Sequence, residues 1–459
     1  MSSHSSTASR PGASPELLRA RRSTALGGRC SVPGDKSISH RALLFGALSD
    51  GPVAISGLGR GGDNLSTARA LAALGVEVDL DATGGEARVV GAGFGGLREA
   101  AQALDCGNSG TTIRLMTGLL AGRPFESVLE GDASLTRRPM RRLAEPLRQM
   151  GATVEGRGET ARPGDIFPPL RVRGGKLHGI TCTLPVASAQ LKSALILAGL
   201  QAQGATQVSE PGLSRDHTER MLAFLGAPIS AHPTIHTVTV DPEGWDGKLR
   251  ALPITVPGDL SSAAFLLVAA LVVPDSEVVV EGVGLNPTRT GALDALAAMG
   301  AELQITVTGT VMGEPVGCVR ARASSLRGIE IGGTLALRSI DEIPALAVAA
   351  AVATGRTVFS DLKELRVKES DRIAALAREL GRAGVLVEER PDGLVIEGLA
   401  GRRPRGGTVK PEHDHRIAMA GAVLGLAAEA GEETVVPADD IATSFPTFAA
   451  TLRDLGASL

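Results

Sequence analysis

The chain has 459 residues, of which 43% are hydrophobic and 21% are charged, and its formal net charge is −3. A chain with so little net charge, no Tyr and a single Trp has neither the positive surface nor the aromatic platforms that favour nucleic-acid binding. Its longest apolar runs fall short of the ~20 residues that a membrane-spanning helix needs. We therefore expect no nucleic-acid or membrane partner, and the length favours two domains.

Residues 1–20 are rich in Ser, Arg and Ala and lack the apolar core of a secretory signal. We expect them to form a disordered N-terminal extension of a cytoplasmic protein. The cysteines lie far apart, without metal-ligand spacing, and this pattern indicates reduced thiols. They are Cys30, Cys106, Cys182 and Cys318.

A strand-like segment over residues 22–32 precedes a pattern that recurs six times, about 75 residues apart. Each recurrence is a short polar cluster that runs into an apolar, helix-like stretch. The clusters comprise residues 34–37, 107–110, 187–190, 258–261, 339–342 and 413–416. The stretches comprise residues 41–48, 113–121, 191–200, 263–271, 343–353 and 417–428. A shared period of this kind indicates one structural unit used six times.

A second helix-like run in each unit ends at a glycine. In the second unit, a strand-like segment at 127–130 follows the apolar stretch, and a second helix at 139–150 ends before Gly151. Glycine at this place favours a left-handed helix cap, and a short β-prone segment follows. Each unit is therefore predicted to be βαβαββ. The corresponding glycines of the other units are Gly75, Gly226, Gly300, Gly384 and Gly456.

The pattern predicts an α/β fold of two similar domains, each made of three βαβαββ repeats. Because the stretch at 345–353 is apolar on nearly all sides, we expect one buried helix per unit inside a shell of sheets and outer helices. The last unit lacks its final strands, and we expect the strand at 22–32 to pair with it. The domains would be residues 33–251 and residues 21–32 plus 252–459, with crossings at Val32–Pro33 and Leu252–Pro253 and a ligand cleft between them.

Basic residues gather near the predicted helix starts. Helix N-termini present free N–H groups and a positive dipole end, so cations beside them predict ligands with several negative charges, such as phosphate and carboxylate. Asp341 and Glu369 lie among these cations and are suited to donate and accept protons. The basic residues are Lys36, Arg41, Arg137, Arg138, Arg215, Lys368, Arg372 and Arg416.

Two simpler interpretations stay open for these clusters. They could be only N-caps, for which Ser and Asp are favoured. Residues 366–372 could be a salt-bridged surface helix, because Lys368 and Arg372 lie one turn apart. No cluster combines His, Asp and Glu at metal-ligand spacing, so we expect neither a metal nor another cofactor.

Seven ordered motifs resemble those of the enolpyruvyl transferase family, over nearly the whole chain after about residue 24. They are PGDKSISHR at 33–41, LDCGNSGT at 104–111, GDASLTRRP at 131–139, SAQ at 188–190, SRDHT at 214–218, RVKESDR at 366–372 and DHR at 414–416. The resemblance implies that each domain is an inside-out α/β barrel and that the two domains close on substrate at a central cleft.

The resemblance also implies the reaction. Phosphoenolpyruvate would give its enolpyruvyl (carboxyvinyl) group to the 5-hydroxyl of shikimate 3-phosphate and release phosphate through a tetrahedral intermediate, a step toward chorismate and the aromatic amino acids. By position, Asp341 resembles the base that takes the hydroxyl proton. Glu369 resembles the acid that protonates the methylene carbon, with Lys36 assisting.

Two sets of residues are implied as substrate ligands. Those for shikimate 3-phosphate are Lys36, Ser37, Arg41, Ser188, Ala189, Gln190, Arg215, Asp341 and Lys368. Those for phosphoenolpyruvate are Lys36, Gly110, Arg138, Gln190, Arg372, His415 and Arg416. The arginines of the second set resemble clamps on phosphate and carboxylate, and Gly110 would allow close backbone approach.

The chain departs from some relatives at Thr443, where they carry Lys. The resemblance therefore does not imply that this position contacts phosphoenolpyruvate. Relatives that resist glyphosate carry Ala at the position of Gly110. We therefore expect glyphosate to compete with phosphoenolpyruvate, and Gly110→Ala to weaken its binding.

The nearest alternative is the sister enzyme that uses UDP-N-acetylglucosamine as acceptor. That enzyme pairs its first Lys with Asn and uses a loop Cys as an acid, whereas Lys36 is followed by Ser37 and no Cys lies in a matching loop. A non-catalytic scaffold that binds polyanions is a second alternative, and it would not need Asp341 and Glu369. We expect a free-standing, monomeric enzyme.

Overall fold

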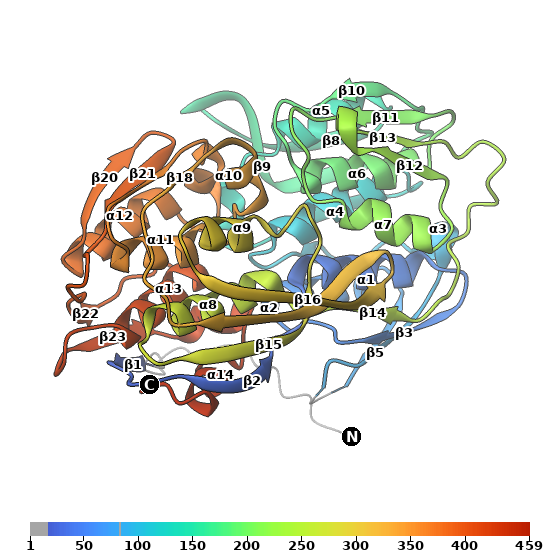
Figure 1. Ribbon diagram of the computed structural model, residues 1–459. Coiled ribbons are helices and arrows are strands. Elements are labelled where there is room, and N and C mark those ends of the chain that lie inside the picture. Colours follow the sequence, from blue (N-terminus) through green and yellow to red (C-terminus); the bar gives the residue numbers. More distant parts are fainter. Residues whose placement is uncertain (1–16, 82–83) are drawn as a thin grey trace, which may run out of the picture.

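The computed structural model describes residues 17–81 and 84–459 (Figure 1). In these residues, six inner helices are surrounded by six small sheets and by a set of outer helices. The fold is α/β, as predicted.

The six apolar stretches form the inner helices, each of which begins within its polar cluster or directly after it. The helices are α1 (Lys36–Leu48), α4 (Gly110–Leu120), α6 (Ala189–Gly199), α8 (Leu260–Val272), α11 (Ile343–Val352) and α13 (His415–Leu426). Because these sequences are apolar around the whole helix, they are buried on nearly every side. α1, α4 and α6 pack together in one half of the molecule, and α8, α11 and α13 pack together in the other (Figure 1).

Each unit has a second, outer helix, and the predicted glycine lies directly beyond its last turn. These outer helices are α2 (Gly62–Ala73), α5 (Arg141–Gln149), α7 (His217–Phe224), α9 (Gly291–Ala298), α12 (Arg372–Arg382) and α14 (Phe448–Asp454). The glycine that follows each one has a φ between 83° and 108°, where a residue with a Cβ is strained. Shorter helices are α3 (Gly93–Gly96), α10 (Gly333–Arg338), η1 (Leu135–Arg137), η2 (Pro233–Ile235), η3 (Lys363–Val367) and η4 (Asp439–Thr443).

Five of the six sheets have four strands, and their strand order is the same. From one edge of each sheet to the other, the first strand runs parallel to the second, the second is antiparallel to the third, and the third is antiparallel to the fourth. In the first half, the sheets are β14 (Ile254–Thr255), β3 (Pro52–Ser56), β5 (Ala87–Val90), β4 (Glu77–Leu80); β6 (Leu104–Asp105), β7 (Glu126–Glu130), β9 (Arg162–Arg173), β8 (Thr153–Glu159); and β10 (Thr181–Thr183), β11 (Thr206–Ser209), β13 (Thr237–Val240), β12 (Ile229–His232).

The second half contains the other three sheets. They are β2 (Gly27–Ser31), β15 (Glu277–Gly284), β17 (Glu314–Arg322), β16 (Glu302–Val311); β18 (Glu330–Ile331), β19 (Arg356–Phe359), β21 (Gly393–Glu397), β20 (Leu386–Arg390); and the three-stranded β22 (Gly407–Thr408), β23 (Glu433–Pro437), β1 (Leu17–Arg21).

The N-terminal strand β1 completes the sixth sheet, where it pairs antiparallel with β23. The predicted extension over residues 1–20 is therefore wrong from Leu17 onward, because the alternating residues Leu18 and Ala20 are buried in the core. Residues 1–16 lie outside the described residues. The expected pairing of residues 22–32 with the last unit is also wrong, since β1 takes that place and β2 pairs parallel with β15 of the fourth unit.

The first and fourth units exchange their first strands. β2 belongs to the sheet of the fourth unit, and β14 pairs with β3 in the sheet of the first unit. The second crossing between the halves therefore lies at Pro257 rather than at Leu252–Pro253, and the predicted boundary at residue 251 misses β14. The two crossing segments bond to each other, because the Asp35 N–H donates to the Pro257 carbonyl (2.7 Å) and the Asp259 N–H donates to the Pro33 carbonyl (2.9 Å).

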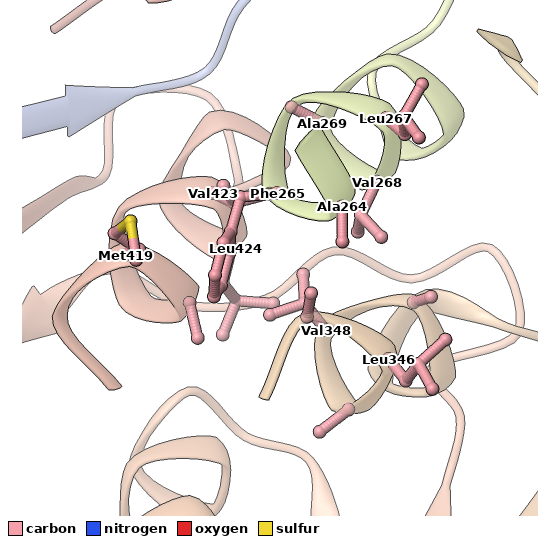
Figure 2. Close-up of a cluster of buried hydrophobic side chains, with 14 of the residues drawn as sticks. Ala264, Phe265, Leu267, Val268, Ala269, Leu346, Val348, Met419, Val423 and Leu424 are labelled. Carbon is pink, nitrogen blue, oxygen red and sulfur yellow. The ribbon is translucent and has the colours of Figure 1, made fainter. Parts of the chain in front are cut away.

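The buried apolar side chains form two separate clusters. One is drawn from residues 38–256 and adds Met312, and the other is drawn from residues 18–26 and 260–457. Figure 2 shows the second cluster, where side chains of α8, α11 and α13 such as Phe265, Val348 and Leu424 lie together. Two cores support the division into two domains, which stays a prediction. Among the described residues, no helix is both long and apolar enough to cross a bilayer.

Candidate active site

The polar clusters cap the inner helices. In five of the six, the side-chain oxygen of the last residue before the helix accepts a backbone hydrogen bond from the first turn. The caps and the residues that donate to them are Asp35 and Ile38, Ser109 and Thr112, Ser188 and Leu191, Asp259 and Ser261, and Asp414 and Arg416. These five clusters therefore do cap their helices, and capping leaves their charged neighbours to be explained.

Asp341, which precedes α11, lies among four cations. Its Oδ1 lies 3.4 Å from Arg372 Nη1 and 3.6 Å from Lys368 Nζ, and its Oδ2 accepts a hydrogen bond from Arg215. Its backbone carbonyl accepts a hydrogen bond from Arg416 Nη1 at 2.6 Å. Burial alone would raise the pKa of Asp341, but the four cations hold it well below its usual range. The carboxylate is therefore ionised and able to accept a proton.

Glu369 lies close by, immediately before α12. Its Oε2 accepts a hydrogen bond from Arg372 Nη2 at 2.7 Å, and the fully buried Arg372 also donates to Asp414 at 2.8 Å. The Ser134 hydroxyl donates to the Glu369 carbonyl at 3.1 Å, which joins this loop to the first half of the chain. Burial would raise the pKa of Glu369, but the surrounding cations, Arg372 foremost, hold it well below its usual range.

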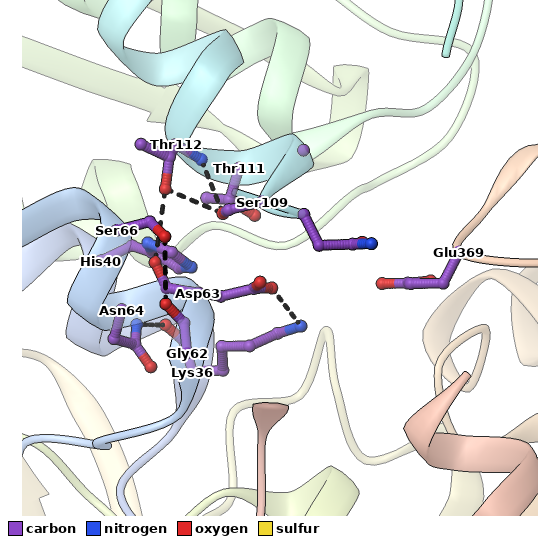
Figure 3. A network of polar contacts seen from close by, with 12 residues as sticks. Lys36, His40, Gly62, Asp63, Asn64, Ser66, Ser109, Thr111, Thr112 and Glu369 are labelled. Carbon is purple, nitrogen blue, oxygen red and sulfur yellow. Dashed lines mark hydrogen bonds and ion pairs between the residues drawn. The ribbon is translucent and has the colours of Figure 1, made fainter. Parts of the chain in front are cut away.

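Lys36 faces this pair from the start of α1. Its Nζ lies 3.0 Å from Oδ2 of Asp63, in the first turn of α2, and both side chains are largely buried. Figure 3 shows Glu369 on the opposite side, with its carboxylate directed toward Lys36 and Asp63. Asp63 is a site residue that the sequence analysis missed, because an acid in the first turn of a helix is an ordinary feature.

Gly110 opens α4 beneath two guanidinium groups. A Cβ built on Gly110 would lie 2.7 Å from Arg114 Nη1 and 2.9 Å from Arg138 Nη1. Arg138 in turn donates to Asn108 Oδ1 at 2.5 Å. The absence of a side chain at Gly110 therefore lets both guanidinium groups reach the helix start. Arg114 was also missed, although its position one helical turn after Gly110 is a usable signal.

Arg41 is buried within α1 and is held by uncharged groups. Its Nε donates to the Thr218 hydroxyl (2.6 Å), its Nη2 to the Ser193 hydroxyl (2.7 Å) and its Nη1 to the Ser37 carbonyl (2.9 Å). Burial lowers the pKa of Arg41 to about 10. A buried cation whose charged form is disfavoured gains most from a bound anion.

Gln190 lies in the first turn of α6, after the Ser188 cap and Ala189. Its Oε1 accepts a hydrogen bond from Arg114 Nη1 at 3.0 Å, and its Nε2 donates to the Thr111 hydroxyl at 2.9 Å. Burial, followed by the nearby Arg138 charge, lowers the pKa of Arg114 to about 10. This second buried cation also favours an anionic ligand.

His415 and Arg416 open α13. Burial, together with the charges of Lys36 and Arg416, lowers the pKa of His415 to about 3, so its ring is neutral near neutral pH. Within the described part of the chain, His415 Nε2, Arg416 Nε and Arg138 Nε are buried and have no hydrogen-bond partner. Buried polar atoms left without partners in one region favour a ligand that supplies them.

The predicted site residues all lie at or near the start of an inner helix or of α5, α7 or α12. Direct contacts join Asp341, Glu369 and their cations, while Lys36 pairs with Asp63. The backbone carbonyls of Ser37 and Ala189 accept hydrogen bonds from the side chains of Arg41 and Ser193, respectively. The individual roles of these residues stay predictions.

Thr443 lies in η4, where the two halves touch. A Cβ built on Gly61, directly before α2, would lie 2.1 Å from the Thr443 carbonyl oxygen, so the two backbones are in close contact. Over residues 17–81 and 84–459, no three His, Cys, Asp or Glu side chains are arranged to hold a metal ion. The four cysteines are free thiols.

Comparison with known proteins agrees with this architecture. Residues 20–452 match the family model described as EPSP synthase (3-phosphoshikimate 1-carboxyvinyltransferase). The chain is 53% identical to the 3-phosphoshikimate 1-carboxyvinyltransferase of Geobacter sulfurreducens, over 93% of this chain and 96% of the relative. It is 52% identical to that of Synechococcus sp. (strain RCC307), over 92% of this chain and 95% of the relative.

A solved structure has the same fold. An EPSP synthase structure from Acinetobacter baumannii superposes with a TM-score of 0.83 and 40% sequence identity, and the match covers 97% of this chain and 99% of the other. The family model spans nearly the whole chain, and the relatives match it at about half of their residues or more. This chain therefore belongs to the EPSP synthase (3-phosphoshikimate 1-carboxyvinyltransferase) family.

Proposed function

We propose that this chain transfers the enolpyruvyl group of phosphoenolpyruvate to the 5-hydroxyl of shikimate 3-phosphate and releases phosphate. The observation that carries the proposal is a set of buried cations gathered around two ionised carboxylates, in a chain whose relatives have this activity by name. Both substrates carry a phosphate and a carboxylate. A site with fixed buried cations binds such molecules at little cost of rearrangement.

The acceptor would lie near α1, α6 and the start of α7. Arg41 and Arg215, with the helix start at Ser188–Gln190, are suited to the phosphate and carboxylate of shikimate 3-phosphate. Its 5-hydroxyl would then face Asp341. The ionised Asp341 carboxylate takes the hydroxyl proton as the oxygen attacks C2 of phosphoenolpyruvate.

Glu369 is assigned the opposite role, since it delivers a proton to the C3 methylene carbon of phosphoenolpyruvate. It is ionised without substrate because cations surround it. Binding of phosphoenolpyruvate adds anionic oxygens beside Arg372, Arg138 and Lys36, and this offsets their effect and raises the pKa of Glu369. The substrate therefore helps to protonate its own acid catalyst.

The tetrahedral intermediate carries the phosphate, the carboxylate and the former 5-hydroxyl oxygen on one carbon. Loss of a proton from C3 to the Glu369 carboxylate and departure of phosphate complete the exchange, so the same residue acts as acid and then as base. Lys36 and the arginines stabilise the charge that develops on the leaving phosphate.

We further propose that the chain works in the cytoplasm as a monomer. Light scattering at assay concentration tests the oligomeric state.

Phosphate release from phosphoenolpyruvate tests the function. We expect release with shikimate 3-phosphate as acceptor, and only background release with UDP-N-acetylglucosamine. Release that depends on UDP-N-acetylglucosamine would favour the sister activity. Release with neither acceptor would contradict both and favour a protein that only binds anions.

A further inference from the structure

Lys192 is a buried cation that does not enter the proposed chemistry. It lies on α6, one turn after the Ser188 cap, with only 3% of its side chain exposed. Its Nζ lies 2.7 Å from Glu210 Oε1 and 2.8 Å from Glu219 Oε1, and both carboxylates are almost fully buried. The ammonium thus joins three elements: α6, the end of β11 and the start of α7.

Glu210 uses the same oxygen to hold the loop that leads to Arg215. Its Oε1 accepts hydrogen bonds from the Ser214 backbone N–H and from the Ser214 hydroxyl, both at 2.9 Å. One carboxylate oxygen therefore connects Lys192 to the residue directly before Arg215. Arg215 then reaches Asp341 in the other half of the chain.

Glu219 links the same ammonium to the groups around Arg41. Thr218, the neighbour of Glu219, accepts a hydrogen bond from Arg41, and so does Ser193, the neighbour of Lys192. Burial lowers the pKa of Arg41, and Glu219 is the foremost group that opposes this effect. Two of the cations assigned to shikimate 3-phosphate, Arg215 and Arg41, are thus connected to partners of Lys192.

A buried ion cluster of this kind is a weak source of stability, since apolar side chains of similar volume often stabilise a core as well. Its geometry is specific, however, because the three charged groups and Ser214 share one set of hydrogen bonds. Burial would lower the pKa of Lys192, but the charges of Glu219 and Glu210 raise it above its usual range. Lys192 therefore stays charged near neutral pH, while burial raises the pKa of its partner Glu219 despite the Lys192 charge.

We propose that Lys192 is a positioning residue, whose ammonium sets the Ser214–Arg215 loop and the Arg41 guanidinium for the phosphate-bearing acceptor. The inference rests on the proposed function, and it assigns the affinity for the acceptor, but not for phosphoenolpyruvate, to a residue that touches neither substrate. The cations assigned to phosphoenolpyruvate, such as Arg372 and Arg138, have their own partners in Asp414 and Asn108.

The test is a comparison of the two substrates in Lys192→Met, which keeps the length of the side chain and removes its charge. We expect the Kd of shikimate 3-phosphate, measured by calorimetry without the second substrate, and its KM to rise between about 10-fold and 100-fold. The KM of phosphoenolpyruvate should stay within about threefold of the wild-type value. Unchanged affinity for shikimate 3-phosphate in a folded variant would overturn the proposal.

Leu197→Ala is the matched control, because Leu197 is fully buried on the same helix and belongs to the apolar core. An equal loss of acceptor affinity in this control would also overturn the proposal, since general loosening of α6 would then explain the effect. If Lys192→Met does not fold, Lys192→Met/Glu219→Gln restores the charge balance and is compared with Glu219→Gln alone. Wild-type protein that releases no phosphate with shikimate 3-phosphate would refute the proposed function instead.

Discussion

Asp341 and Arg215 lie 126 residues apart in the sequence, and yet the Asp341 carboxylate accepts a hydrogen bond from the Arg215 guanidinium. Each residue belongs to a different half of the molecule. The Ser134 hydroxyl makes a second connection of this kind when it donates to the Glu369 carbonyl. Both proposed catalytic residues are thus joined to the first half, Asp341 through its carboxylate and Glu369 through its backbone carbonyl, so the site is complete only when the halves meet.

Asp341→Asn and Glu369→Gln should each lower kcat by about 10²–10⁴, because general acid and base catalysis is worth roughly that much. Steady-state phosphate release measures the effect. Asp294→Asn is a suitable control, since Asp294 forms an exposed ion pair with Arg338 at 2.8 Å on the outer helix α9. If both active-site variants kept turnover within about twofold of wild type, the acid and base roles would be untenable.

Gly110→Ala should fold normally and weaken glyphosate. The new methyl would meet the Arg114 and Arg138 guanidinium groups at 2.7 Å and 2.9 Å, and these flexible ends can move away. Both the displaced cations and the methyl narrow the pocket assigned to phosphoenolpyruvate. We expect the inhibition constant of glyphosate to rise by about tenfold or more and the KM of phosphoenolpyruvate to rise less. Equal inhibition constants for the two proteins would contradict this account.

His415 should stay neutral throughout the working range of pH. Burial, with Lys36 and Arg416, lowers its pKa from 6.5 to about 3. Between these values the unfolded chain binds a proton that the folded chain does not, so this residue makes stability fall as pH drops from 6.5 toward 3. Side-chain NMR, assigned with His415→Gln, should detect no titration of His415 between about pH 5 and 8. A midpoint inside that range would refute the prediction.

Gly384→Ala should destabilise the protein by about 1 kcal/mol or slightly more, because Gly384, which follows the C-cap residue of α12, has a φ of 83°. Gly381→Ala is the matched control three residues earlier. Gly381 lies within α12, and a Cβ there would meet nothing within 4 Å, so Ala should stabilise by about 0.5–1 kcal/mol. Urea unfolding of both variants measures the difference. Equal shifts of the same sign would show that backbone conformation does not decide the effect.

Much of the fold can be predicted from local pattern alone. The apolar stretches of the inner helices, the capping residues such as Asp35 and Ser109, and the glycines such as Gly384 act within a few residues of the chain. Their physical causes are therefore visible in short segments of sequence. The ordered motifs carry the same kind of information for the site and include Glu369, while Asp341 lies in the polar cluster at 339–342.

Strand exchange could not be predicted in the same way. A five-residue strand such as β2 has many chemically equivalent places to pair, and the choice depends on the packing of the whole sheet. This is why local pattern alone places residues 22–32 with the last unit, where β1 lies instead. Asp63 was not predicted for a related reason, since an acidic residue in the first turn of a helix has no distinctive local pattern.

The sequence by itself determined the repeated unit, its helices and caps, and the excess of cations near the helix starts, because these follow from periodicity and side-chain chemistry. Only the tertiary structure decided which cations lie around Asp341 and Glu369, which hydroxyls hold Arg41, and how Lys192 connects Glu210 with Glu219. Ion pairs between residues far apart in sequence depend on where whole elements pack, and burial then decides how strongly each charge acts.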